Sequence, residues 1–135
     1  MKAVFDTNVL IAAFLTEGLC AKLLLRARHN DFSLILCPFI SQEFKKFLQI
    51  KIKSSSQEIE LALNLLEQAA SEINQPSIFI ERTCRDADDD NILICALSSE
   101  SDYLVTGDDD LLTLRKYGKT EIIKPRQFES LFIAD

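Results

Sequence analysis

Residues 2–15 read KAVFDTNVLIAAFL, a short apolar run that ends at an aspartate and is followed at once by a second apolar run. The first run, Lys2 to Phe5, has the length and composition of a buried strand, whereas Val9 to Leu15 is typical of the start of a helix. A buried strand that leads directly into a helix is the repeating unit of a parallel sheet covered by helices. In a fold of this kind, the same strand–helix unit should recur along the rest of the chain.

The same alternation continues to the end of the sequence. We predict four further strands, at Ser33 to Cys37, Ser77 to Ile80, Tyr103 to Thr106 and Glu121 to Ile123. We predict five further helices, at Leu19 to Arg28, Phe39 to Lys53, Ser56 to Ile73, Asn91 to Ser99 and Asp110 to Arg115. Strands that alternate with helices predict an α/β fold with a parallel sheet covered on both faces. No linker or repeat divides the chain, so we expect a single domain over residues 1–135.

Composition agrees with a compact fold and excludes several classes of protein. The chain has 135 residues, of which 47% are hydrophobic and 27% charged, and this balance excludes disordered and collagen-like chains. No apolar stretch approaches the roughly 20 residues that cross a bilayer. The N-terminal stretch carries Asp6 and Asn8 and has no small-residue cleavage site, so we expect no signal peptide and a cytoplasmic protein without membrane contact.

Scarce residue types narrow the possible chemistry. His29 is the only histidine, which removes serine–histidine triads and HExxH zinc sites. The three glycines form neither a GxGxxG motif nor a P-loop. The cysteines show no CxxC pair, and we expect neither a structural disulfide nor a zinc site; they are Cys20, Cys37, Cys84 and Cys95. Any chemistry must therefore use carboxylates.

Carboxylates follow the predicted strands. Asp6 ends the first strand, Glu43 lies one helical turn into the helix after the second, and Asp108 closely follows the strand at Tyr103 to Thr106. A run of three aspartates, residues 88–90, precedes the helix at Asn91. Ligands of open α/β sheets bind at the carboxyl ends of the strands. Two carboxylates about 4 Å apart repel by about 4 kcal/mol at an effective dielectric near 20, and Mg²⁺, which prefers oxygen ligands, removes that cost.

The acidic segment is confined to one part of the chain. Residues 86–110 contain nine acids and no Lys or Arg, so the rest of this chain of net charge −6 carries +3. An acidic protein is a poor binder of nucleic acid, because phosphate contacts come from Lys and Arg. Bound divalent cations would reverse the sign of the charge locally.

Each acid also has a structural interpretation. Asp6 could cap the following helix, but a carboxylate among apolar neighbours is costly for a mere cap. Glu43 could lie at the edge of a solvated helix face, and acids in the 86–90 run could simply favour a helix N-terminus. Asp89 is our choice from that run because of its spacing from Leu93 and Ala96, although Asp90 has a similar relation to the same face.

Four stretches of the sequence together resemble the PIN domain, in particular VapC-like toxins of toxin–antitoxin pairs. These stretches are DTNVLIAAF, SQEFKKFL, RDADDDNILICAL and DYLVTGDDDLLTL. The resemblance implies a Rossmann-like three-layer α/β/α sandwich with a mostly parallel sheet of about five strands, and an endoribonuclease that depends on Mg²⁺ or Mn²⁺. Its acidic quartet falls on Asp6, Glu43, Asp89 and Asp108, and supporting positions fall on Asn8, Thr106 and Asp110, with Asp90 as the other candidate beside Asp89.

The implied reaction is hydrolysis of an RNA phosphodiester by a water that attacks in line. Asp6, Asp89 and Asp108 would hold the metal, and Glu43 would bind it or orient the water. Phosphate contacts would come from basic residues around Glu43, of which Lys45 and Lys46 are the first candidates, followed by Lys51, Lys53, Lys22, Arg26 and Arg28.

The same resemblance implies two protein partners. A toxin of this kind is expected to bind a cognate antitoxin that covers the active groove, and to form a homodimer. Leu61 and Leu65 lie off the main apolar stripe of the helix that begins at Ser56, and we expect them at such an interface.

Two other acidic α/β proteins are alternatives. A phosphoacceptor receiver module would use Thr106 and the Lys124-Pro125 pair, but it needs paired acids after the first strand, where Asp6 stands alone. A haloacid-type phosphatase needs an aspartate at position 8, where this chain has Asn8. The nuclease interpretation fits more of the acids.

Overall fold

The computed structural model describes residues 1–76, 78 and 83–132. The strands are β1 (Lys2–Phe5), β2 (Ser33–Leu36), β3 (Ala70–Ile73), β4 (Tyr103–Val105), β5 (Lys116–Tyr117) and β6 (Thr120–Ile123). The helices are α1 (Thr7–Leu15), α2 (Leu19–Arg28), α3 (Pro38–Phe47), α4 (Ser56–Ala69), α5 (Ala87–Ser98), α6 (Asp109–Leu112) and α7 (Pro125–Ser130). A short π-helical segment, Leu48–Ile52, extends α3.

The strands form one sheet in the order β3-β2-β1-β4-β6-β5. All neighbouring strands are parallel except β5, which pairs antiparallel with β6. The chain runs outward from β1 to β2 and β3 and then returns to the other side of β1 with β4. This reversal places the carboxyl ends of β1 and β4 next to each other, and that is where open α/β sheets bind ligands.

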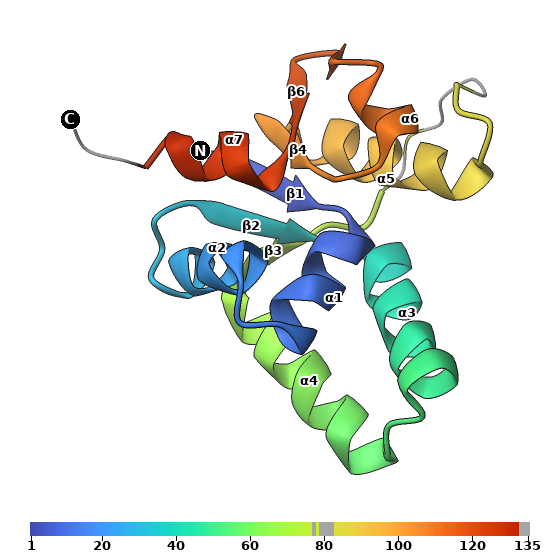
Figure 1. The fold of residues 1–135 in the computed structure, drawn as a ribbon. Helices are drawn as coiled ribbons and strands as arrows, with labels where there is room; N and C mark the ends of the chain where they lie inside the picture. Colours follow the sequence, from blue (N-terminus) through green and yellow to red (C-terminus); the bar gives the residue numbers. More distant parts are fainter. Residues whose placement is uncertain (77, 79–82, 133–135) are drawn as a thin grey trace.

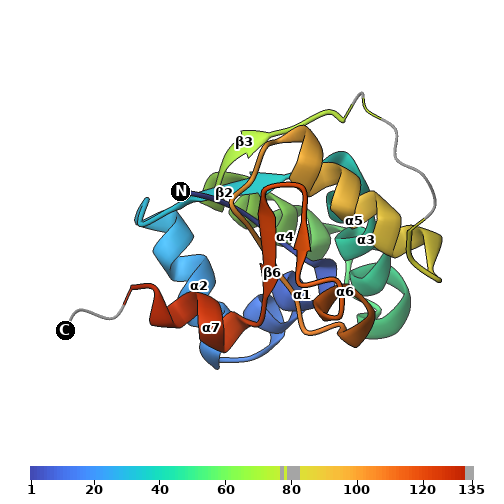
Figure 2. The same cartoon turned by 90° about the horizontal axis from the view of Figure 1, so that it is seen from above.

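Helices cover both faces of the sheet, and the three-layer α/β/α architecture is confirmed. Figure 1 shows α1, α2 and α4 on one side of β1 and β2, with α5 on the other, and Figure 2 shows α5 crossing above these strands. Val4, Leu34 and Leu104 on the central strands are almost completely buried, as expected for parallel strands packed on both faces. The rigid core fixes the strand ends that carry the acids.

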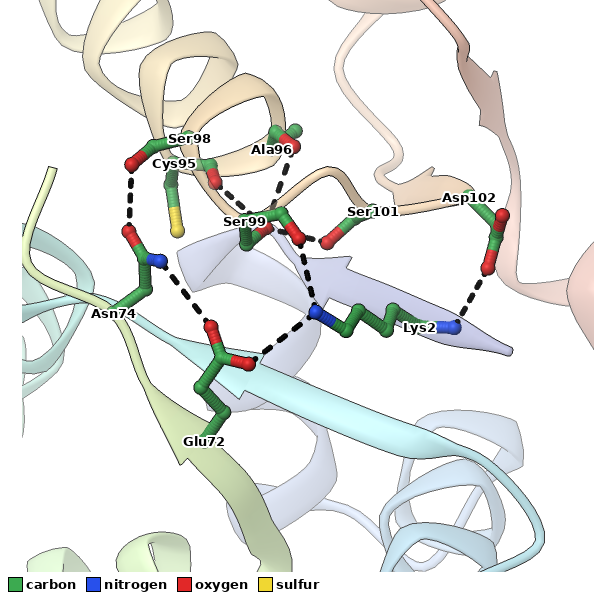
Figure 3. Close-up of polar contacts among 9 residues, drawn as sticks. All are labelled: Lys2, Glu72, Asn74, Cys95, Ala96, Ser98, Ser99, Ser101 and Asp102. Carbon is green, nitrogen blue, oxygen red and sulfur yellow. Dashed lines mark hydrogen bonds and ion pairs between the residues drawn. The ribbon is translucent and has the colours of Figure 1, made fainter. Parts of the chain in front are cut away.

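One end of β1 is held by the polar contacts in Figure 3. The Lys2 backbone N–H donates to Asp102 (2.9 Å), and its Nζ donates to the Ser99 carbonyl (3.2 Å) and contacts Glu72 (3.4 Å). Ser98 donates to Asn74 (2.8 Å), which joins α5 to the segment after β3. These contacts tie β1, β3 and the α5–β4 turn together at the start of β1, whereas Asp6 follows its end.

The predicted helix at Ser56 to Ile73 was wrong in its last turn. Helix α4 ends at Ala69, and Ala70–Ile73 pairs with β2 as an edge strand. The apolar spacing of Ala70 and Ile73 continues the helical pattern, but Ile73 is 55% exposed and belongs to no buried stripe. A further helical turn would bury little apolar surface here. Pairing with β2 instead gives the backbone hydrogen bonds along the edge of the sheet, and this arrangement is the one adopted.

Other boundaries moved by smaller amounts. Helix α5 begins at Ala87, four residues before the predicted start, so the acidic run forms its first turn. The helix predicted over Phe39 to Lys53 divides into α3 and the π-helical segment, and Lys53 ends it with a positive φ of 58°. The strand predicted at residues 77–80 lies, apart from Ile78, outside the described residues. The strand β5 and the helix α7 were not predicted.

The expectation of no disulfide was also wrong. Cys37, directly after β2, is bonded to Cys95 on α5 across 58 residues of sequence. Both cysteines lie inside apolar runs, which made them look like ordinary core residues. The sheet order brings the two runs together, and sequence spacing alone contains no sign of this contact.

Within the described residues, no single helix has the length and apolar character needed to cross a membrane, although α1 and α2, which are bent by 98° relative to each other, meet the criteria when taken as a pair.

Candidate active site

Six carboxylates from separate parts of the chain line one cavity of about 230 Å³. They are Asp6, Glu43, Asp86, Asp88, Asp89 and Asp108, and we call this cavity the acidic cavity. Its remaining walls are formed by Thr7, Asn8, Ile11, Phe47 and Ile92. The four predicted catalytic acids thus lie around a single cavity, at the carboxyl ends of β1, β2 and β4.

Asp6 is buried and is held by strand β4. Although it occupies the N-cap position of α1, its side chain makes no capping hydrogen bond. Its Oδ2 accepts a 2.7 Å hydrogen bond from the hydroxyl of Thr106 instead. Burial raises the pKa of Asp6, and the nearby charge of Asp108 adds to this effect against the hydrogen bond from Thr106. The simple capping interpretation of Asp6 is therefore not what the structure shows.

Thr106 also organises the loop after β4. Its hydroxyl oxygen accepts a 3.0 Å hydrogen bond from the backbone N–H of Asp108. Asp108 in turn accepts at Oδ1 from the N–H of Asp110 (2.9 Å) and so caps the short helix α6. A single buried hydroxyl thus connects Asp6 to the backbone of Asp108.

Three carboxylates come close enough to share an ion. One oxygen from each of Asp89, Asp108 and Asp110 lies within 4.8 Å of the other two. Burial raises the pKa of Asp89 to about 6, with further contributions from the negative charges of Asp108, Asp86 and others. Asp110, expected only to support the site, thus belongs to this cluster, whereas Asp6, a predicted metal ligand, is not one of its three members.

The three consecutive aspartates have different environments. Asp89 is buried and lines the acidic cavity, whereas Asp88 is exposed at its rim. The carboxylate of Asp90 accepts hydrogen bonds from the backbone N–H groups of Cys84 (2.9 Å) and Thr83 (3.3 Å). Asp90 therefore anchors the segment before α5, and Asp89 is the member of the run in the acidic cluster.

Glu43 is fixed by a residue that sequence reasoning missed. The Thr7 hydroxyl donates a 2.7 Å hydrogen bond to Glu43 Oε1. Partial burial raises the pKa of Glu43, and the charges of Asp88 and Asp6 raise it further against the bond from Thr7. The signal was present, because Thr7 stands between two residues already singled out, Asp6 and Asn8. Asn8 itself is exposed and lines the cavity.

A cation of the chain touches the cluster as well. Arg85, in the segment before α5, places a guanidinium nitrogen 2.7 Å from Asp110 Oδ1. The pair is exposed to solvent on the arginine side, so its contribution to stability is small. Arg85 nevertheless brings a positive charge next to the cluster of Asp89, Asp108 and Asp110. Arg85 begins the stretch RDADDDNILICAL, but the sequence analysis assigned it no role.

The candidate RNA-binding lysines lie on different sides of α3. Lys46 shares a cavity wall with Glu43 and Phe47, next to the acids. Lys45 lines a separate cavity toward α4, together with Ile59 and Leu63. Of the more distant candidates, Arg26 and Lys22 form ion pairs with Glu129 of α7 (2.6 and 3.3 Å).

The donor set suits a hard divalent cation. Carboxylate oxygens are the ligands that Mg²⁺ and Mn²⁺ prefer, and three of them converge within 4.8 Å at Asp89, Asp108 and Asp110. Burial first, and then the negative charges of neighbouring acids, raise the pKa of Asp89, and a bound cation would offset both effects. No histidine or cysteine lies among the lining residues, so the donor set does not resemble that of a zinc site.

Comparison with known proteins agrees with this geometry. A family model described as the PIN domain matches residues 2–110. Among solved structures, one chain of VapBC2 from Rickettsia felis, crystallised bound to a DNA fragment from its promoter, is similar with a TM-score of 0.64. The two chains are 14% identical, and the match covers 92% of this chain and 98% of the other, which shows a shared fold. No curated protein matches the sequence significantly.

Proposed function

This chain belongs to the PIN-domain family, whose members are generally nucleases, and from this premise we propose that it is a metal-dependent endoribonuclease, the toxin of a toxin–antitoxin pair. The observation that carries the proposal is the acidic cavity, in which carboxylates from four separate segments surround a space of about 230 Å³. Such a concentration of negative charge, with Asp6 and Asp89 buried, is costly without a counter-ion.

Asp89 and Asp108 would hold the cation, together with Asp6 or Asp110. Mg²⁺ or Mn²⁺ in this position would activate water for attack on phosphorus and neutralise charge on the phosphate. The Thr106 hydroxyl links the Asp6 carboxylate to the Asp108 backbone through hydrogen bonds of 2.7 and 3.0 Å, and so fixes their relative positions. The chain thus supplies a preformed set of ligands.

Glu43 is the best-placed proton acceptor. Thr7 holds its carboxylate at the cavity wall with a bond of 2.7 Å, and burial together with neighbouring acids raises its pKa toward the range useful for proton transfer. Glu43 would therefore orient the attacking water and take its proton. Among the described residues that line the cavity, none is Ser, Cys or Lys, so direct attack by water fits this lining better than a covalent intermediate.

We propose RNA as the substrate and a cognate antitoxin as the regulator. The antitoxin would cover apolar surface, and the helices α1, α2 and α4 present such surface in a cavity lined by Phe14, Leu24, Leu25 and Leu65 among others. Leu61 on α4 is 61% exposed and is available to a second copy of this chain or to the antitoxin. Because cellular RNA is the proposed substrate, we place the reaction in the cytoplasm.

A receiver-type signalling function is less well supported. That alternative needs a lysine at the acidic site, and Lys124 is exposed and forms the N-cap of α7 rather than part of the acidic cavity. By contrast, the four acids of the nuclease proposal, Asp6, Glu43, Asp89 and Asp108, all line the acidic cavity.

Incubation with a mixed RNA pool tests the proposal. Wild-type protein should cleave RNA with Mg²⁺ or Mn²⁺ and not with chelator, and Asp6→Asn should reduce the rate by at least about 100-fold. Asp102→Asn is a suitable control, because Asp102 is bonded to the Lys2 backbone N–H at the start of β1. Equal cleavage by Asp6→Asn, or cleavage that persists in chelator, would contradict the proposal.

A further inference from the structure

An apolar surface adjoins the acidic cavity on helix α3. Phe47 is half-buried and lines the acidic cavity. It also lines a second cavity, of about 310 Å³, together with Glu43, Lys46, Ile50 and Lys51. Glu43 belongs to both cavities, so the two spaces share a wall. We call this second space the α3 groove.

The core does not use this face of α3. Ile40 and Phe44 are completely buried, and they face the interior of the protein. Glu43, Phe47 and Ile50 recur at spacings of four and three residues, which places them on a common helix face. Ile50 is 54% exposed, so more than half of its surface remains in contact with solvent. This face therefore has an apolar surface that the fold itself does not require.

Positive charge borders the same surface. Lys46 and Lys51 line the α3 groove beside Phe47 and Ile50. Lys46 also lines a third cavity with Phe39, Gln42 and Asp88, on the other side of Glu43. An aromatic and an aliphatic side chain beside two lysines in one groove match the two parts of a nucleotide, a base and a phosphate.

We propose that Phe47 and Ile50 bind an unpaired base of the RNA next to the bond that is cut, while Lys46 contacts its phosphate. This inference rests on the proposed nuclease function and names the subsite that the substrate strand would occupy. A base can stack on the ring of Phe47 only when it is free of a partner strand. The protein should therefore prefer single-stranded RNA around the cleaved bond.

Removal of single bases from the RNA tests the contact directly. In the Asp6→Asn background, which should not cleave, the affinity for a fluorescent single-stranded RNA would be measured by anisotropy with Mn²⁺ present. The RNA would carry one abasic nucleotide at each position in turn. We expect one position at which the missing base weakens binding about tenfold, the size typical of a lost base–aromatic stack.

Two substitutions at one residue separate stacking from folding. Phe47→Tyr keeps the aromatic ring and should keep the sensitive position. Phe47→Leu keeps an apolar side chain without the ring, so it should bind intact RNA about tenfold more weakly and become indifferent to the abasic site. Lys46→Ala should weaken binding to all the RNAs alike. Its control Lys116→Ala, at an exposed position on the edge strand β5 that does not line the α3 groove, should not.

Several outcomes would overturn the inference. They are equal sensitivity of the Phe47→Leu variant and the wild-type protein to the abasic site, equal effects of Lys116→Ala and Lys46→Ala, and failure of the Asp6→Asn protein to bind single-stranded RNA. A fall in molecular mass of Phe47→Leu in sedimentation, with RNA affinity unchanged, would assign the groove to a second copy of the chain. Absence of cleavage by the wild-type protein would count against the proposed function, whereas the binding measurements would still decide the base subsite.

Discussion

The hydroxyl of Thr106 donates a 2.7 Å hydrogen bond to Asp6, one hundred residues earlier in the chain. The same oxygen accepts from the backbone N–H of Asp108 at 3.0 Å. Because β1 and β4 are neighbours in the sheet, this contact sets the relative position of two acids that the fold brings together from distant parts of the sequence.

Replacing Thr106 should therefore affect both stability and metal binding. Thr106→Val removes the hydroxyl that donates to the buried carboxylate of Asp6. The loss of this donor should cost about 1–3 kcal/mol of unfolding free energy. Thr106→Ser keeps the hydroxyl and should restore Mn²⁺ affinity. Urea unfolding and calorimetric titration measure the two effects. If the valine and serine variants bind Mn²⁺ equally, Thr106 does not position the acids.

Thr7 should act on the reaction through Glu43. Thr7→Val removes the 2.7 Å hydrogen bond to Glu43 without removing a charge, so we expect kcat to fall about tenfold with little change in KM. Glu43→Gln should lower kcat further, and adding Thr7→Val to it should then have little effect. Steady-state cleavage of a short RNA gives both constants. Independent, additive effects of the two substitutions would contradict this coupling.

Protonation of Asp89 predicts how stability changes with pH in metal-free protein. Burial and neighbouring acids raise its pKa from 3.8 to about 6 in the folded state. The folded protein therefore binds this proton more tightly than the unfolded chain does. The resulting contribution to the free energy of unfolding is complete below the pKa of Asp89 in the unfolded chain, and it is lost as the pH rises through about 6. Asp89→Asn should accordingly be more stable than wild type at neutral pH in chelator.

Thermal unfolding at several pH values checks this sign. The advantage of Asp89→Asn should shrink toward acidic pH and should also shrink when Mg²⁺ is added to the wild type at neutral pH. A variant less stable than wild type at neutral pH in chelator would show that Asp89 is not under electrostatic strain.

The Cys37–Cys95 bond predicts a redox effect on stability. It closes a long loop, with a sequence separation of 58, so Cys37→Ser should lower the unfolding free energy by about 2–4 kcal/mol. Cys20 is free, and Cys20→Ser serves as the control. Denatured, unreduced protein should present two reactive thiols, those of Cys20 and Cys84. Four reactive thiols would show that the bond is absent under the conditions tested.

The order of short apolar runs and helical spacings in the sequence was enough to predict most strands and helices of the fold. The apolar runs at β1, β2, β4 and β6 are each followed by a polar residue or a proline, so their ends were visible in the sequence, and the acids could be placed at one edge. The pattern failed at Ala70–Ile73, where helical spacing continues although the backbone has turned into a strand at the free edge of β2. Pairing with another strand leaves little trace in a short run of residues.

For the site as well, the sequence indicated some residues, whereas others could be recognised only in the folded chain. Asp6 and Asp108 could be placed at the sheet edge because each follows a strand. Helical spacing favoured Asp89 without separating it clearly from Asp90. In the structure, Asp89 lines the cavity, whereas the backbone N–H groups of Thr83 and Cys84 hold the Asp90 carboxylate. Contacts between side chains far apart in sequence, such as Thr7 with Glu43 or Arg85 with Asp110, need the folded chain to be seen.

Calorimetric titration of Mn²⁺ into the metal-free protein tests the central claim most directly. Asp108 and Asp109 are neighbours of the same charge, but only Asp108 lies in the acidic cluster and the cavity lining. We expect saturable binding to the wild type, affinity at least about tenfold weaker for Asp108→Asn, and unchanged affinity for Asp109→Asn. No detectable binding to the wild type, or equal losses in the two variants, would contradict it.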